Sequence, residues 1–286
     1  MPSILITGAS TGIGETCALE LDRLGHRVFA GVRQAADGER LKAKASERLS
    51  WLILDVTSAD QIAAAAKAVD DAVGDAGLDG LVNNAGIAVG GPLEYVGIDQ
   101  VRRQFEVNVF GLLAVTQAFL PAIRRATGRI VNIGSIAGRA TTPMVGPYCA
   151  SKHAVESFTD GLRLELIDAG IHVSVIEPGV VQTPIWDKGA DQLTNVGHSL
   201  PPAALERYAN KIKVFTHLLE ANRHAGVPPT VVAQAVLHAL TADSPKTRYL
   251  IGRDAKIRAL IGRFLPDRVA DLFILGFLKR LERQFS

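Results

Sequence analysis

Short aliphatic runs bounded by Gly, Asn or Pro alternate with longer segments of helical period from Ser3 almost to the end of the 286-residue chain. This alternation is typical of repeated strand–helix units, which build a parallel sheet covered by helices on both faces. It predicts an α/β fold with a doubly wound, seven-stranded parallel sheet. The strands are expected at Ser3–Thr7, Arg27–Val32, Trp51–Leu54, Gly80–Asn83, Arg129–Ile133, His172–Ile176 and Arg248–Ile251.

The helical segments are expected at Gly12–Leu24, Ser58–Val73, Asp99–Ala126 and Pro147–Ala169. The alternation breaks at residues 184–229, an insertion that contains a helical stretch from Ala203 to Asn222. Insertions of this length often form a lid or a pocket wall over the substrate. Apolar side chains in it could line such a pocket or belong to the core: Ile185, Trp186, Val214, Phe215, Leu218 and Leu219. Because 48% of the residues are hydrophobic and 21% are charged, we expect residues 1–286 to form a single domain with a large core.

The first strand–helix junction has the composition of a phosphate-binding turn. The strand ILIT runs directly into GASTGIG, which places Gly8, Gly12 and Gly14 where the chain turns sharply into a helix. Glycine is needed there because a dinucleotide pyrophosphate must approach the backbone N–H groups at the positive end of the helix. The motif therefore predicts a Rossmann-type NAD(P)-binding domain. The predicted contact residues in this turn also include Ser10, Thr11 and Ile13.

The same residues formally match the nucleophile elbow GxSxG of α/β-hydrolases, with Ser10 as the nucleophile. That site needs a second oxyanion-hole N–H from an earlier strand and loop. Only seven residues precede Gly8, so the hydrolase interpretation is disfavoured.

Selectivity between NAD and NADP is set where the second strand ends, by the residue that meets the adenosine ribose. Here RVFAGV is followed by Arg33, whose guanidinium can pair with a 2′-phosphate, whereas a carboxylate would repel it. We therefore expect NADP(H) to be favoured over NAD(H). Asp37 and Glu39 follow closely, and either could accept hydrogen bonds from a ribose hydroxyl, so NAD stays an alternative.

Tyr148 and Lys152 are four residues apart on a predicted helix, so their side chains share one face. A free tyrosine titrates near ~10 and is a poor proton shuttle at neutral pH. An ammonium about 4 Å away, at an effective dielectric near 20, favours the phenolate by roughly 4 kcal/mol, or about 3 pKa units. The spacing therefore predicts a tyrosine with a lowered pKa that acts as a general acid and base.

Three further features occur with this pair. NNAG at Asn83 to Gly86 follows the predicted fourth strand, Asn108 lies within a predicted helix, and Ser135 follows the strand segment IVNIG. Together with TGASTGIG and YCASK, they resemble the single-domain form of the short-chain dehydrogenase/reductase family over about residues 3 to 183.

The resemblance implies a role for each matching residue. Tyr148 would be the general acid and base, Lys152 its pKa modifier and a donor to the nicotinamide ribose, and Ser135 a donor to the substrate oxygen. Asn108 would hold a water in the proton relay to the lysine. The remaining cofactor contacts that it implies are Asp55 and Val56 beside the adenine, Asn83, Ala85 and Gly86 along the adenine-ribose side, and Pro178, Gly179, Val181 and Thr183 at the nicotinamide.

The reaction implied is hydride transfer between a nicotinamide cofactor and a carbonyl or alcohol carbon, without a metal. The seven histidines include no HExxH motif or paired His/Cys cluster. The YCASKHAVESF segment and the long C-terminal region are similar to relatives that act on steroids, retinoids or other lipophilic ketones and alcohols. Two alternatives stay open: an NAD-dependent alcohol dehydrogenase of the same family, and a non-catalytic dinucleotide-sensing regulator.

The charge distribution bears on partners and location. A net charge of +2 gives no drive toward nucleic acid, but Ser244 to Ser286 carries ten Lys/Arg against four Asp/Glu. Within this stretch, residues 253–286 form a basic, apolar C-terminal extension that could contact an anionic membrane weakly, a second subunit or its own domain. The chain has two cysteines, no segment typical of a signal peptide and no run of 18 successive apolar residues. We therefore expect a cytoplasmic protein. We also expect it to be a homo-oligomer.

Overall fold

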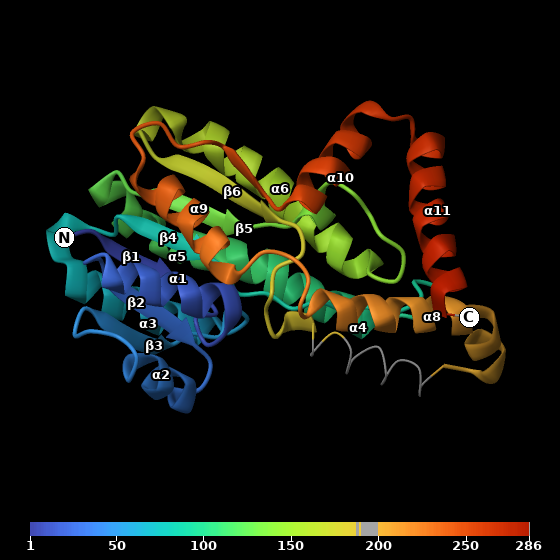
Figure 1. The fold of residues 1–286 in the computed structure, drawn as a ribbon. Helices are drawn as coiled ribbons and strands as arrows, with labels where there is room; N and C mark the ends of the chain where they lie inside the picture. Colours follow the sequence, from blue (N-terminus) through green and yellow to red (C-terminus); the bar gives the residue numbers. More distant parts are fainter. Residues whose placement is uncertain (187–188, 190–199, 286) are drawn as a thin grey trace.

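The computed structural model describes residues 1–186, 189 and 200–285. Seven parallel strands form one sheet, as the alternation predicts, and the structure gives their order as β3-β2-β1-β4-β5-β6-β7 (Figure 1). The strands are β1 (Ser3–Ile6), β2 (Arg27–Val32), β3 (Leu49–Ile53), β4 (Gly80–Asn83), β5 (Arg129–Ile133), β6 (His172–Pro178) and β7 (Arg248–Ile251). The expected third strand, Trp51–Leu54, therefore begins two residues earlier than predicted.

The strands are buried on both faces because their side chains alternate between two cores. Ile4 and Ile6 of β1 face the core beneath α1 (Gly12–Arg23) and α9 (Pro229–Thr241), whereas Leu5 faces the opposite one. The opposite core lies beneath α3 (Ala59–Val73), α5 (Gly111–Ala126) and α6 (Gly146–Leu166). A short helix, α2 (Ala35–Lys42), packs against β3.

The strand order reverses between β1 and β4. β1 pairs with β2 on one side and with β4 on the other, so the connections leaving β1 and β4 diverge at the carboxyl end of the sheet. Such a reversal opens the crevice in which α/β proteins bind their ligands. Most of the predicted site residues lie on segments that leave β1, β2, β3, β4, β5 and β6 at this edge.

The single helix expected at Asp99–Ala126 is interrupted. α4 (Ile98–Phe105) passes into a π-helical turn, η2 (Glu106–Phe110), before α5 begins at Gly111. Asn108 lies within this turn, where its buried side chain bonds to the main chain of Ile87. π-Helical turns inside longer helices are frequent at functional sites. The run Ile98–Ala126 is also the one stretch of the described residues long and apolar enough to span a bilayer, and half of its most apolar window is buried within the fold.

The chain after β6 extends the structure beyond the sheet. α8 (Pro202–Asn222) lies within the predicted insertion, and α10 (Arg253–Phe264) and α11 (Asp267–Phe285) form the C-terminal extension. Figure 1 shows α11, in red, standing apart from the sheet with its far end near α8, and the two helices contact one another. The remainder of the insertion, residues 187–188 and 190–199, lies outside the described residues.

Candidate active site

The glycine-rich turn after β1 forms a cradle for an extended ligand. Gly8 and Gly12 have positive φ angles of 64° and 61°, which favour glycine. A Cβ at Gly8 would come within 2.8 Å of the Ala85 Cα, so a side chain there would collide with the segment after β4. α1 begins at Gly12 and directs its N-terminal N–H groups toward this turn. The residues present therefore fit the pyrophosphate of a dinucleotide.

The NNAG segment supports the glycine-rich turn through hydrogen bonds. Two of the residues that make these bonds, Thr7 and Asn84, were not predicted from the sequence as site residues. The Asn84 side-chain amide donates to the carbonyl oxygens of Thr7 and Gly8 at 2.9 and 3.0 Å. The Thr7 hydroxyl accepts from the main-chain N–H groups of Asn84 and Ala85, both at 3.0 Å. An amide placed directly after a strand is the signal that could have identified Asn84.

Asn83, which we expected at the cofactor, faces the core with its side chain. Its amide donates to the Thr116 hydroxyl and to the Asn132 side-chain oxygen, each at 2.9 Å. Any contribution of Asn83 to the crevice therefore comes from its main chain. Ala85 and Gly86 follow at the edge of the sheet, and a Cβ at Gly86 would lie 3.4 Å from the Asn108 amide oxygen.

Two arginines lie around the end of β2. Arg33 is exposed, and its charge acts on Asp55, which follows β3. Burial alone would raise the pKa of Asp55. Hydrogen bonds from Thr57 and the nearby charges of Arg33 and Arg103 instead hold this pKa below its usual value. Arg40 of α2 was not predicted: it donates to the Ser10 carbonyl at 2.6 Å and to Asp37 at 3.0 Å. Asp37, the alternative ribose acceptor, is therefore paired.

Tyr148, Lys152 and Ser135 meet at the carboxyl end of β5. Tyr148 and Lys152 lie on one face of α6, with the lysine ammonium 5.9 Å from the centre of the tyrosine ring. That ammonium donates to the Ile133 carbonyl at 2.7 Å, which anchors α6 to the last residue of β5. The Ser135 hydroxyl interacts with Tyr148 and also accepts from the Ala137 N–H at 3.1 Å.

The pKa expected for Tyr148 is wrong for this structure. Burial raises the pKa of the phenol above its ordinary value, while the Ser135 hydroxyl and the charge of Arg258 oppose that shift. Burial also lowers the pKa of Lys152 to about 8, against the opposing charge of Glu156. The expectation considered only the attraction between ammonium and phenolate. It omitted the cost of desolvating both charged forms, which here is the larger effect.

Asn108 connects the loop after β4 to α6. Its amide nitrogen donates to the Ile87 carbonyl at 3.0 Å and to the Ser151 hydroxyl at 3.1 Å, and Ser151 donates to the Tyr148 carbonyl at 2.7 Å. Gln104, one turn earlier, bonds to the same loop through Ile87 and Val89. The Asn108 side chain thus joins the segment near the crevice to the helix that carries Tyr148.

A group of buried charges lies behind Lys152. Glu156, one turn along α6, and Glu177 of β6 share Arg248 at 3.2 and 3.3 Å, and Arg139 lies 3.3 Å from Glu177. Burial and the neighbouring Glu177 raise the pKa of Glu156, while Arg248 and Arg139 oppose that shift. The four-residue spacing of Tyr148, Lys152 and Glu156 is the sequence signal that could have placed the first carboxylate beside the lysine.

The segment after β6 closes the other side of the crevice. A Cβ at Gly12 would lie 3.3 Å from the side chain of Thr183, so this segment returns to the glycine-rich turn. Its first residues are fixed by the main chain, because Gly179 donates to the Ile251 carbonyl at 2.9 Å and Val181 bridges Val227. Pro178 accepts a long 3.5 Å bond from the Ser135 hydroxyl. Val56, which we expected beside the adenine, is buried.

An apolar wall stands beside Tyr148. Met144 and Val145, which precede α6, pack against α8 and the residues just after Thr183. The cluster contains Phe215, Leu218 and Leu219 together with Trp186, four of the six insertion residues considered for a pocket. Val214 is buried outside this cluster, and Ile185 is partly buried.

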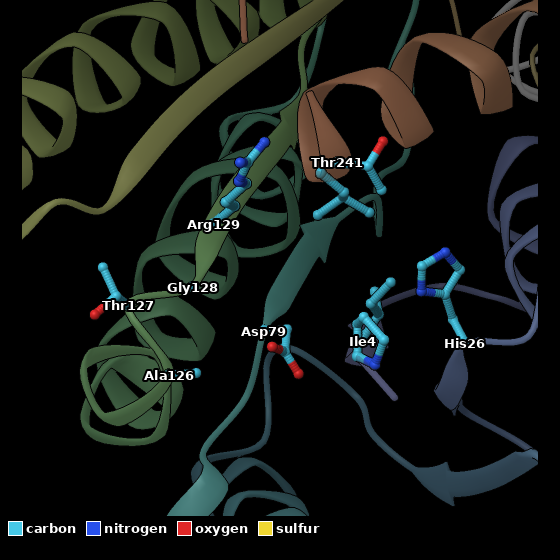
Figure 2. A pocket seen from close by; sticks show the side chains of 10 residues that line it. Ile4, His26, Asp79, Ala126, Thr127, Gly128, Arg129 and Thr241 are labelled. Carbon is cyan, nitrogen blue, oxygen red and sulfur yellow. The ribbon is translucent and has the colours of Figure 1, made fainter. Parts of the chain in front are cut away.

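A separate cavity of about 320 Å³ lies at the opposite edge of the sheet. Figure 2 shows Ile4, His26, Asp79 and Arg129 around it, near the strand amino ends. Dinucleotides bind at the carboxyl ends of parallel strands, so this cavity is not the candidate site. Within the described part of the chain, no group of three His, Cys, Asp or Glu is arranged to hold a metal ion.

The sequence is similar to a known family and to named proteins over most of its length. The sequence profile of the family described as short chain dehydrogenase matches residues 2–193. Mouse retinol dehydrogenase 5 is 38% identical over 99% of this chain and 91% of its own, and bovine 17-beta-hydroxysteroid dehydrogenase type 6 is 38% identical over 95% and 87%.

Solved structures share the fold over nearly the whole length. A short-chain dehydrogenase from Streptomyces avermitilis superposes with a TM-score of 0.79 at 30% identity, covering 98% of each chain. A short chain dehydrogenase from Burkholderia cenocepacia in complex with NADP gives 0.71 at 27% identity, covering 95% of each.

The site generates a prediction about Lys152. Because burial lowers its pKa to about 8, the ammonium is expected to lose its proton as the pH rises through 8, far below the ordinary value for lysine. Heteronuclear NMR of lysine-labelled protein measures this titration, and Lys152→Arg identifies the signal. Exposed Lys67, whose pKa is raised by the hydrogen bond and charge of Asp71, is the contrasting surface lysine. A Lys152 signal that titrates near 10.5 would contradict the burial argument.

Proposed function

The chain belongs to the short-chain dehydrogenase family, and we propose that it interconverts a carbonyl and an alcohol of a lipophilic substrate with NADP(H) as the cofactor. The observation that carries the proposal is the meeting of Tyr148, Ser135 and Lys152 at the edge of the sheet that also bears the glycine-rich cradle. A bound nicotinamide ring supplies hydride chemistry to such a site.

The residues of this chain supply the acid–base and positioning parts of the reaction. During reduction, the Tyr148 hydroxyl donates its proton to the developing alkoxide, while the Ser135 hydroxyl holds the same oxygen by a hydrogen bond. The phenol carries its proton at neutral pH, and the Ser135 hydroxyl and the charge of Arg258, which lower its pKa against the effect of burial, favour release of that proton to the alkoxide. During oxidation, Lys152 stabilises the phenolate that accepts the proton, and Asn108 supports α6 through Ser151.

The preference for NADP rests on the two arginines near the end of β2. Arg33 is exposed and Arg40 reaches the glycine-rich turn, so a 2′-phosphate would meet positive charge from two directions. Asp37, one of the two carboxylates that could select NAD, is paired with Arg40, and the other, Glu39, is exposed on α2. The Burkholderia cenocepacia relative was solved with NADP, which supports the same choice.

The lipophilic substrate is inferred from the apolar wall formed by Met144, Phe215, Leu218, Leu219 and Trp186. Apolar walls with a few polar groups are typical of sites for water-insoluble ligands. The names of two relatives, a retinol dehydrogenase and a 17-beta-hydroxysteroid dehydrogenase, indicate substrates of this kind.

We further propose that the protein is cytoplasmic and contacts a membrane peripherally through α11. Its two cysteines are free and buried, which is consistent with a reducing compartment. Leu272, Phe273, Leu275 and Phe277 are large, exposed apolar side chains on this helix. Lys279, Arg280 and Arg283 follow them and would attract anionic lipid. The alternative to membrane contact is that a second copy of the chain covers these apolar side chains in a homo-oligomer. No nucleic acid is involved in either case.

Tyr148→Phe tests the proposed reaction. Removing the hydroxyl while keeping the ring is expected to lower kcat for ketone reduction by about 10²- to 10⁴-fold, the usual contribution of general acid–base catalysis. A screen of ketones and alcohols with both cofactors, followed by absorbance of the reduced form, gives the measurement. Tyr249→Phe is the control, since that hydroxyl bonds His238 and Lys246 at the other end of β7.

Equal turnover by wild type and Tyr148→Phe would reject the assignment of Tyr148. Cofactor binding without turnover of any substrate by the wild type would instead favour a dinucleotide-sensing regulator.

Arg33→Ala tests the cofactor preference. Loss of a charge-assisted bond to the 2′-phosphate is expected to raise KM for NADP roughly tenfold to a hundredfold and to leave KM for NAD unchanged. Arg23→Ala, an exposed arginine paired with Glu20 on α1, is the matched control. Tighter binding of NAD than of NADP by the wild type would overturn the preference.

Vesicle co-sedimentation tests the membrane contact. The full chain is expected to sediment with phosphatidylserine-containing vesicles at low salt. The double variant Leu272→Glu/Phe273→Glu is expected to stay in the supernatant, because it loses apolar area that would enter the membrane and its added negative charge weakens the attraction to anionic lipid. Leu164→Glu, at an exposed leucine of α6, is the control. Wild-type protein in the supernatant, together with concentration-dependent self-association in sedimentation velocity, would assign the patch to a second copy.

A further inference from the structure

α10 packs directly against the edge of the sheet that carries the candidate active site. Ala255 and Ala259 of this helix form a buried cluster with Ile136, the first residue after Ser135, and with Leu250 of β7. α10 also contacts β7 and the short helix η3 (Ile136–Gly138), and Figure 1 shows α11 following α10 at the end of the chain. The first helix of the C-terminal extension is therefore part of the framework around Ser135 and Tyr148.

Arg258 of α10 holds the segment that joins Ser135 to Tyr148. One guanidinium nitrogen donates to the Ala140 carbonyl at 2.9 Å and to the Thr142 hydroxyl at 2.7 Å. Two residues further on, Met144 has a positive φ of 68°, which is rare for a residue with a side chain, and its carbonyl accepts from Gly91 at 2.7 Å. The segment is thus fixed at both ends, and the Arg258 contacts oppose its relaxation.

Arg258 also brings a positive charge to the phenol. The titratable groups that face its guanidinium are Tyr148 and Cys149 of α6 and Asp254 of its own helix. Its charge lowers the pKa of Tyr148 against the larger effect of burial, in the same direction as the Ser135 hydroxyl. Lys152 lies one turn further along α6, with its ammonium near the Tyr148 ring, so Arg258 and Lys152 are two cations near the phenol.

Asp254, one turn before Arg258, holds the segment on the other side of the site. Its carboxylate accepts from the Val180 N–H at 2.9 Å. A Cβ at Gly179 would collide with this carboxylate, so the glycine makes the close approach possible. Asp254 therefore fixes the turn that follows β6, the same turn that carries the predicted nicotinamide contacts Pro178 to Thr183.

We propose that Arg258 and Asp254 are positioning residues of the active site. Arg258 fixes the 139–145 segment and places a positive charge beside Tyr148. Asp254 fixes the Pro178–Val181 turn. α10 is then a required part of the reaction centre, and its role is separate from that of α11. The proposal rests on the proposed function, because it assigns both residues to the support of Tyr148 and the cofactor turn.

The charge is tested in protein without cofactor or substrate. In ring-¹³C-tyrosine-labelled protein, with the Tyr148 signal identified by Tyr148→Phe, Arg258→Gln is expected to titrate Tyr148 at a higher pH than the wild type. Arg258→Lys keeps the charge and is expected to restore the wild-type value. Lys256→Gln, an exposed change on the same helix, is the matched control and should leave the value unchanged. A wild-type Tyr148 titration in Arg258→Gln would overturn the charge role.

Positioning is tested by kinetics on the same proteins. Arg258→Gln is expected to lower kcat for ketone reduction roughly tenfold or more with little change in cofactor KM, whereas Asp254→Ala should mainly raise cofactor KM. Asp254→Asn keeps an oxygen acceptor for Val180 and is expected to recover most of the loss. Wild-type kinetics in both Arg258→Gln and Asp254→Ala would overturn the positioning role.

Two outcomes separate this inference from the proposed function. If the wild type reduces no carbonyl compound, the proposed function fails, while the tyrosine titration still decides the role of Arg258. If circular dichroism shows Arg258→Gln to be unfolded, Arg258→Lys decides: a folded lysine variant with the wild-type Tyr148 titration supports the charge role, and one with a raised titration contradicts it.

Discussion

The parallel direction of all seven strands is the constraint on which the site depends. Because every strand ends at the same edge, Thr7 after β1, Asn84 after β4 and Ser135 after β5 lie close together although the sequence separates them widely. The reversal of strand order between β1 and β4 opens the crevice at that edge. The glycine-rich turn, the NNAG segment and the turn after β6 then form its walls, and α6 brings Tyr148 to its end.

Burial of charge determines how the site is tuned. Lowering the pKa of Lys152 from 10.5 to about 8 corresponds to roughly 3 kcal/mol of desolvation that is not compensated. The structure limits this cost through the Ile133 carbonyl and through Glu156, which lies in a cluster of two buried carboxylates, Glu156 and Glu177, and two partly exposed arginines, Arg139 and Arg248. The same desolvation raises the pKa of Tyr148 and so disfavours its phenolate. Neighbouring cations are therefore needed in both directions, because they stabilise the phenolate that forms when Tyr148 donates its proton and that accepts one during oxidation.

Local patterns in the sequence predicted the features whose partners are near in sequence. The glycine spacing after the first strand, the pair Tyr148 and Lys152, and the positions of the seven strands along the chain follow from turn chemistry and hydrophobic periodicity. Features that depend on distant segments were missed. Arg258 contacts Thr142 across 116 residues, Asp254 contacts Val180 across 74, and Asn108 in the π-helical turn bonds to Ile87 across 21. The pKa of Tyr148 was predicted with the wrong sign, because a helical spacing shows which charge is near but not how much water is excluded.

The central claim is that the Tyr148 hydroxyl meets the substrate oxygen at the end of the glycine-rich crevice. A crystal structure with NADP and an unreactive analogue of a lipophilic ketone tests it most directly. The account predicts the pyrophosphate on the turn from Gly8 to Gly14, and the analogue's oxygen within hydrogen-bond distance of both the Tyr148 and Ser135 hydroxyls. A structure in which the cofactor occupies that turn while the Tyr148 hydroxyl points into solvent, away from the analogue, would contradict it.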